Sequence, residues 1–306
     1  MAPAARTYLS QALDIMEQHS LLRRKVDWTD LRDTAFAQAH GARKPADTYG
    51  AISWALRSLG DAHSSFMEPE QAKESLESPA VDLHELEGRS LKNGIGYLSF
   101  PGARGSQEAY DQYVQRGRAA VAKADENGAC GWVVDLRNET GGGMWPVLAV
   151  VGPILGDGKV GMFVDADGKK YTWSIKNGAP YLDGRSKGWD DARPVARNSP
   201  PVAVLTSQGT ASAGEAVVVA FRGRPRTRSF GTPTDGVPTG NNAYRLSDAA
   251  LINLTEAKDA DRTGRTYDAA IPPDEEIARN PLARDRDDVL RAAQDWLLKQ
   301  SACARP

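Results

Sequence analysis

The chain has 306 residues, of which 41% are hydrophobic and 25% are charged, and its formal net charge is −2. These values are typical of a globular protein with one large core and a smaller appendage, and they exclude the basic surface that binding to nucleic acid or anionic membrane requires. No apolar stretch approaches the ~20 residues that span a bilayer, so we expect no membrane span. The composition leaves the oligomeric state open.

The first 67 residues predict a small unit of three helices, and His63 follows the third helix on an exit loop. The next segment, 68–92, is polar and charged, and we expect an irregular connection there. Apolar residues recur at near-helical spacing in the stretches 9–16, 31–39 and 49–59.

From residue 93 to residue 300, strand patterns alternate with helix patterns, which predicts an α/β core. Asp167 and Gly168 are a hairpin signal between two of the strands. Residues 301–306 are expected to form a tail. The expected strands are 94–100, 132–136, 160–164, 171–175, 202–205, 229–231, 242–246, 251–254 and 265–267, and the expected helices are 109–126, 145–154, a run behind residue 212, and 284–299.

Three features of the sequence indicate where the protein is located and whether it holds a cofactor: the cysteines, the histidines and the first five residues. Two cysteines are too few for a disulfide scaffold, so we expect Cys130 to be a small core residue and Cys303 to lie in a frayed tail. No metal-ligand spacing occurs, so we expect neither a metal nor another cofactor. The opening Met-Ala-Pro-Ala-Ala lacks the regions of a secretory signal, which leaves a cytoplasmic protein or an exported one whose leader has been removed. The exported location, periplasmic or secreted, is our working expectation.

A serine stands where a predicted strand turns into a helix. The apolar run 202–205 ends at small residues, and a helix-compatible run begins directly behind Ser212. The first N–H groups of a helix have no partner and can bind a developing oxyanion, so this layout suits a nucleophile for acyl transfer. The spacing of Ser212 and Glu215 is also typical of a capping box, in which the pair merely opens the helix.

Two further segments are candidates for a catalytic site. His63 has no obvious packing role, although most loop histidines are surface residues. Gly141, Gly142 and Gly143 stand where a strand meets a helix, and glycines there let the backbone approach a ligand and direct N–H groups at an anion. The triplet fits neither the dinucleotide fingerprint nor the phosphate-binding loop, so a plain turn is the alternative. Four arginines between residues 222 and 228 are typical of a solvated loop.

Together and in this order, these segments resemble one family, the C-terminal-processing (tail-specific) serine peptidases, whose relatives include tricorn protease and interphotoreceptor retinoid-binding protein. The resemblance covers nearly the whole chain. It implies a ClpP/crotonase-like α/β core of repeated ββα units with a small N-terminal helical domain. The matching segments are Leu59-Gly60-Asp61-Ala62-His63-Ser64, Gly94-Ile95-Gly96-Tyr97-Leu98, Asp135-Leu136-Arg137 with Gly141-Gly142, Thr210-Ala211-Ser212-Ala213-Gly214-Glu215 and Tyr267-Asp268-Ala269-Ala270-Ile271-Pro272-Pro273-Asp274.

Departures from the family pattern indicate the branch. Some members pair the serine with a lysine that follows it, and no lysine occurs between Ser212 and Lys258. The resemblance therefore implies the tricorn-like branch, in which His63 is the base. Ala62 stands where that branch has a serine, and Glu139 stands where the family has an asparagine. The segment 68–92 is too short for the PDZ module that many members carry.

The resemblance implies a serine endopeptidase that hydrolyses peptide bonds of peptides or protein segments through an acyl-enzyme. Asp268 is the favoured acid for orienting the histidine, and Asp61 is the nearby alternative. Two alternatives stay open on the same fold: a binding protein without catalysis, and an esterase or amidase that uses the same serine. The implied site residues are Ser212, His63 and Asp268 for catalysis, Ala213, Gly141 and Gly142 for the oxyanion hole, and Glu215 and Asp61 for structural support.

Overall fold

The computed structural model describes residues 1–77, 83–277 and 287–304. The chain forms two compact units. The helical unit comprises Met1–Ser78, Val164–Lys170 and Thr239–Lys258, and the core unit comprises Pro79–Phe163, Tyr171–Pro238 and Asp259–Pro306. The sequence predicted a different division, into residues 1–67, 68–92, 93–300 and 301–306. That division stays a prediction.

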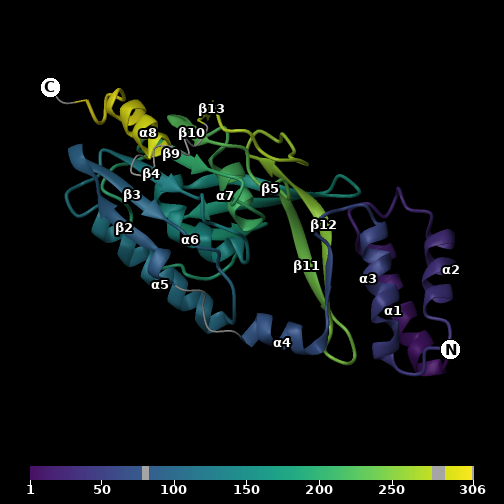
Figure 1. Ribbon diagram of the computed structural model, residues 1–306. Helices are drawn as coiled ribbons and strands as arrows, with labels where there is room; N and C mark the ends of the chain where they lie inside the picture. Colours follow the sequence, from purple (N-terminus) through teal and green to yellow (C-terminus); the bar gives the residue numbers. More distant parts are fainter. Residues whose placement is uncertain (78–82, 278–286, 305–306) are drawn as a thin grey trace. The chain divides into compact units, whose positions relative to one another are not determined.

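Three helices form the helical unit's apolar centre, as the periodicity predicts (Figure 1). Apolar side chains from all three helices pack with Ile252 and Leu254 from a late strand. Asp248 accepts hydrogen bonds from the hydroxyls of Tyr8 (2.7 Å) and Tyr49 (2.5 Å), so a late loop is tied to the first and third helices. The helices are α1 (Pro3–His19), α2 (Trp28–Gln38) and α3 (Tyr49–Ser58), with the 3-10 turn η1 (Pro45–Thr48) before α3.

Antiparallel strands complete the helical unit. The strands β1 (Ser65–Met67) and β11 (Thr239–Arg245) both pair with β12 (Leu251–Asp261). Asn253 of β12 lies opposite Ser65 on one side and Ala243 on the other. Because β1 begins two residues after His63, this pairing fixes the loop that carries the histidine.

The segment 68–92 is not the irregular connection that its polarity predicts. Its described residues include the helix α4 (Pro69–Glu77), the turn η2 (Leu83–Glu85) and the strand β2 (Glu87–Ser90). Gly88 lets β2 lie against a helix, since a Cβ at this position would be 1.9 Å from the carbonyl oxygen of Ala120. A polar strand with one small buried residue carries almost no periodic signal, so the sequence pattern missed it.

The sheet of the core unit has the strand order β13-β10-β9-β4-β3-β2. All of its strands run parallel except β2, which is antiparallel to β3. The loops that follow β4 and β9 therefore leave from the same edge, which is where ligands bind in open parallel sheets. The strands are β3 (Ile95–Ser99), after the turn η3 (Lys92–Gly94), then β4 (Gly131–Asp135), β9 (Val202–Thr206), β10 (Thr227–Gly231) and β13 (Glu275–Glu276).

Helices cover both faces of this sheet (Figure 1). The helices α5 (Gln107–Ala124), α6 (Met144–Leu155) and α7 (Ala213–Phe221) pack against Trp132 and Val204 on one face. On the other face, α8 (Asp288–Leu298) packs against Val133 and Leu205. Because neighbouring residues of β4 and β9 are buried on opposite faces, both strands are apolar throughout, as the continuous runs in the sequence predict.

Four further strands are β5 (Gly158–Asp165), β6 (Lys170–Lys176), β7 (Ala179–Leu182) and β8 (Arg185–Ser186). The turn predicted between β5 and β6 is confirmed, because the amide of Asp165 donates to the carbonyl of Lys169 at 3.1 Å and Gly168 has a φ of +78°. The strand expected at 265–267 is wrong, since Thr266 forms only an isolated bridge. The expected start of the last helix, at 284, lies outside the described residues.

No helix in the described ranges has the length and apolarity to cross a bilayer.

The two cysteines form a disulfide, which corrects the expectation that both are unpaired. Cys130 precedes β4 and Cys303 follows α8, and their Cα atoms are 5.0 Å apart. Both residues are buried, so Cys303 does not lie in a frayed tail. Composition alone could not pair them, because the partners are 173 positions apart and the fold brings them together.

We expect removal of this cross-link to lower the free energy of unfolding by about 2–4 kcal/mol, because it closes a long loop in the unfolded chain. The test is urea unfolding of a Cys130→Ala/Cys303→Ala double variant beside the oxidised and reduced wild type. The double variant should unfold at the midpoint of the reduced protein. Equal midpoints for the oxidised and reduced wild type would contradict the pairing.

Candidate active site

Ser212 occupies a strained position at the start of α7. It follows the loop after β9 and has a φ of +52° and a ψ of −107°, a conformation that non-glycine residues rarely adopt. Such strain costs on the order of 1–3 kcal/mol and persists only where the surroundings impose it. The side chain is half-buried, and Ala213 directly behind it is buried as the first residue of the helix.

Glu215 imposes that conformation. Its carboxylate is buried and accepts four hydrogen bonds, from the amides of Ser212 (3.0 Å), Gly236 (3.0 Å) and Val237 (2.9 Å) and from the hydroxyl of Thr234 (2.6 Å). Burial raises the pKa of Glu215, while these donors act in the opposite direction. The bond to Ser212 is one half of the capping box predicted from the spacing. An ordinary helix cap needs neither the other three hydrogen bonds nor the positive φ of Ser212. Those three bonds connect the serine loop to the segment 234–237.

The glycine turn after β4 lies directly beside Ser212. A Cβ on Gly141 would be 3.2 Å from the Cβ of Ser212, and a Cβ on Gly142 would be 1.9 Å from the carbonyl oxygen of Ala103. Both glycines have positive φ angles, +100° and +115°. Only glycine satisfies both the conformation and the close approach, so the triplet is more than a plain turn.

Glu139 is a buried acid of this site whose role the sequence did not reveal. Its side chain is fully buried, and its Oε2 accepts the amide of Gly141 at 3.2 Å. Its backbone carbonyl accepts the amide of Ala211 at 3.0 Å, which joins the glycine turn to the serine loop. A Cβ on Gly214 would be 2.4 Å from Oε2, so the glycine of the Ser-Ala-Gly-Glu segment makes room for this carboxyl. Burial raises the pKa of Glu139 to about 8.

Of the three amides predicted to bind an oxyanion, the structure leaves two available. The amide of Gly141 is engaged by Glu139. The amides of Gly142 and Ala213 have no acceptor within residues 1–77, 83–277 and 287–304. The core unit thus brings Ser212 together with the glycine turn and the helix start, and the binding of an oxyanion by these amides stays a prediction.

His63 lies in the helical unit, on the loop between α3 and β1. Its Nδ1 is 2.7 Å from the hydroxyl oxygen of Thr239 at the start of β11, a partner that the sequence did not suggest. Asp61 holds the loop backbone, because its carboxylate accepts the amides of His63 (3.0 Å) and Ser64 (2.6 Å) and the hydroxyl of Thr255 (3.0 Å). These hydrogen bonds are the physical basis on which the supporting role of Asp61 rests, and that role stays a prediction. The pairing of His63 with Ser212 joins two units and stays a prediction.

Asp268 lies in the core unit, in an exposed segment after Tyr267. Its role as the orienting acid stays a prediction. A second acid nearby in sequence, Asp259, is fully buried, and burial raises its pKa well above the ordinary range. Neither oxygen of Asp259 has a hydrogen-bond partner in the described part of the chain, and the charge of Glu215 favours its neutral form.

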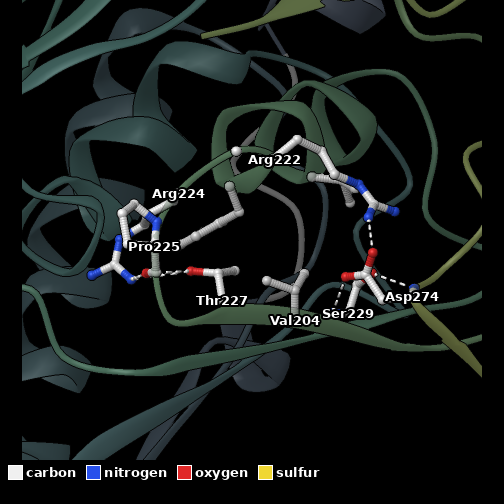
Figure 2. Close-up of a pocket in the computed structure, with 10 residues that line it drawn as sticks. Val204, Arg222, Arg224, Pro225, Thr227, Ser229 and Asp274 are labelled. Atoms are coloured by element: carbon white, nitrogen blue, oxygen red, sulfur yellow. Dashed lines mark hydrogen bonds and ion pairs between the residues drawn. The ribbon is translucent and has the colours of Figure 1, made fainter. Parts of the chain in front are cut away.

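Two of the four arginines between residues 222 and 228, Arg222 and Arg224, are not part of the solvated loop that their sequence suggests, whereas Arg226 is exposed. Arg224 is buried at the end of α6 and donates to the carbonyls of Ile154 (3.0 Å) and Leu155 (3.1 Å), and burial lowers its pKa to about 10. Arg222 pairs with Asp274 (2.6 Å), and both residues line a cavity of about 300 Å³ (Figure 2). This cavity lies at the end of α7 opposite to Ser212, and its polar groups are mostly bonded to one another. We regard it as a structural network.

The fold is an α/β core that carries a strained serine at a helix start, and comparisons identify the family. The sequence profile of peptidase family S41 matches residues 94–277. The nisin-resistance protein of Lactococcus lactis subsp. lactis is 26% identical over 275 residues, which cover 89% of this chain and 83% of that protein. Two solved structures share the fold: a lipoprotein from Streptococcus agalactiae (TM-score 0.78, 24% identity, 97% of both chains) and a photosystem II D1 C-terminal processing protease (TM-score 0.66, 16% identity, 96% of this chain and 98% of that one).

This chain belongs to peptidase family S41. It is therefore a peptidase, a hydrolase that acts on peptides or proteins, and the predicted resemblance and α/β fold class are confirmed.

We expect a Glu215→Ala variant to lose roughly 3–5 kcal/mol of unfolding free energy, because four donors in or at the edge of the core would lose their acceptor. Urea unfolding beside Glu126→Ala measures this loss. Glu126 is an exposed residue after α5, and its replacement should change stability by less than about 0.5 kcal/mol. A Glu215→Ala variant as stable as the control would show that the carboxylate does not hold the serine loop.

Proposed function

We propose that this peptidase is a serine endopeptidase that cleaves peptide bonds through an acyl-enzyme on Ser212. The observation that carries the proposal is the strained serine at the start of α7, beside the available amides of Gly142 and Ala213. Strained nucleophiles at helix starts are typical of acyl-transfer enzymes, because the turn exposes the hydroxyl and aligns main-chain donors with the oxyanion.

In the proposed reaction, His63 takes the proton of the Ser212 hydroxyl as its oxygen attacks the substrate carbonyl. The two amides stabilise the resulting oxyanion. When the tetrahedral intermediate collapses, the C–N bond breaks and the histidine donates its proton to the leaving amine. Water then attacks the acyl-enzyme by the same steps and releases a carboxylic acid and the free serine.

Thr239 and Asp268 are the proposed supports of the base. In the neutral tautomer that carries its proton on Nδ1, the ring donates to the hydroxyl of Thr239, which leaves Nε2 as the base. Asp268 is the proposed acid that stabilises the ring once it is cationic, following the general logic of serine triads.

The substrates that we propose are peptides or flexible protein segments. The lactococcal relative is named for resistance to nisin, so nisin belongs in the substrate panel together with unstructured peptides. An ester panel tests the esterase alternative. A site that binds peptides without reacting is the outcome that would favour the binding-protein alternative.

We expect a fluorophosphonate probe to label the wild type, and both Ser212→Ala and His63→Ala to reduce labelling and peptide hydrolysis by at least about 1,000-fold. Mass spectrometry should locate the label on Ser212. Labelling that survives Ser212→Ala would place the nucleophile elsewhere. A wild type that binds peptides but is never labelled would contradict the peptidase mechanism.

We expect Thr239→Val to lower kcat by roughly 10- to 100-fold with little change in KM, because the ring loses the partner that holds its tautomer. Thr239→Ser keeps the hydroxyl and should retain most of the activity. Equal rates for the valine and serine variants would show that the hydroxyl does not orient His63.

A further inference from the structure

The proposed reaction makes no use of the buried carboxyl of Glu139. This carboxyl contacts both segments that surround the oxyanion site, the glycine turn after β4 and the first turn of α7. Its Oε2 accepts the amide of Gly141 at 3.2 Å, and the same oxygen lies against Gly214 in the first turn of α7. Its backbone carbonyl accepts the amide of Ala211, the residue before the serine. Any change in the charge of Glu139 therefore changes the electrostatic potential at the groups that would bind the oxyanion.

We propose that Glu139 is a positioning residue for the oxyanion site, in which the neutral carboxyl holds the glycine turn against Ser212 and ionisation of the carboxyl suppresses the reaction. This inference rests on the proposed serine-peptidase function.

The surroundings of Glu139 favour its neutral form. Burial raises its pKa to about 8, and the amides of Gly141, Gly214 and Ala103 together with the charge of Arg104 only partly oppose this effect. Arg104 is exposed and donates to Thr140, so water screens much of its charge. Tyr113 of α5 is the other titratable group that faces Glu139, and its hydroxyl donates to the carbonyl of Pro101 at 2.9 Å. From α7, the contact is Gly214, which carries no charge.

The hydrogen bonds indicate which oxygen carries the proton. Oε2 accepts the amide of Gly141, whereas Oε1 is buried and has no partner in the described residues. A buried neutral O–H without a partner is less costly than a buried charge without one. The proton therefore belongs on Oε1, where it leaves the bond to Gly141 intact.

Ionisation would place a full negative charge beside the position where the reaction develops its own negative charge. Like charges about 5 Å apart in a partly buried site change a rate by roughly 10- to 100-fold. Glu215 differs in its partners, because four hydrogen bonds stabilise its carboxylate, whereas the carboxyl of Glu139 is held by main-chain amides alone, with that of Gly141 at 3.2 Å.

Glu139→Gln tests the proposal, because the amide keeps the shape and the acceptor for Gly141 but does not ionise. The measurement is the second-order rate of fluorophosphonate labelling of Ser212 between about pH 6 and pH 10. We expect the wild-type rate to fall roughly 10- to 100-fold above about pH 8. Glu139→Gln should still be labelled on Ser212 and should lack this fall. Glu126→Gln is the matched control, an exposed glutamate that should retain the wild-type profile.

Each outcome has a distinct meaning. Labelling of Ser212 with the same alkaline fall in Glu139→Gln and wild type would overturn the role of Glu139 and leave the proposed function intact. A wild-type rate that stays level through pH 9.5 would do the same. No labelling at any pH, or labelling that survives Ser212→Ala, would instead overturn the proposed function. Circular dichroism at both ends of the pH range checks that each variant remains folded.

A spectroscopic measurement covers the case in which Glu139→Gln does not fold. Infrared spectra of the Ser212→Ala protein with ¹³C-labelled glutamate carboxyls should show a protonated buried carboxylic acid at neutral pH. We expect its C=O band to disappear as the pH passes through about 8. Absence of that band at neutral pH would show that Glu139 is already ionised and would overturn the proposal.

Discussion

The buried carboxylate of Glu215 holds the serine loop in a conformation that a serine does not adopt unaided. One carboxylate oxygen accepts the amide of Ser212, and the remaining bonds anchor the segment 234–237. A positive φ at a non-glycine residue is unfavourable, so it persists only where stronger bonds impose it. The position of Ser212 at the start of α7 and the available amide of Ala213 both follow from this one cluster.

The parallel sheet supplies the second constraint. Since β4 and β9 are neighbours and run in the same direction, the loops after them leave from one edge and converge. The glycines of the first loop then allow an approach that a side chain would block, as the short distances from a Cβ on Gly141 or Gly142 show. The site is therefore built largely from backbone, which is rigid and carries its donors at fixed positions.

Two buried acids lie near the start of α7, where the helix dipole favours negative charge. Burial raises the pKa of both acids, to about 8 for Glu139, and Glu215 accepts four hydrogen bonds, including one from a side-chain hydroxyl, whereas Glu139 is held by main-chain amides. The sequence indicated Glu215 through its capping-box spacing. It indicated Glu139 only as a departure from the family pattern, because a fully buried carboxyl with one unpartnered oxygen is a property of packing and not of spacing. Thr239 was missed for the same reason, since 176 positions separate it from His63.

By itself, the sequence determined the features that depend on neighbours along the chain: the three N-terminal helices, the continuous apolar strands β4 and β9, the turn at Gly168, and the serine at a helix start. Local periodicity and turn chemistry encode these features directly. Only the tertiary structure decided the pairing of Cys130 with Cys303, the strand β2 and the burial of Arg224 and Glu139. Each of these depends on groups that are distant in sequence and that meet only when the core has formed, so no local pattern records them.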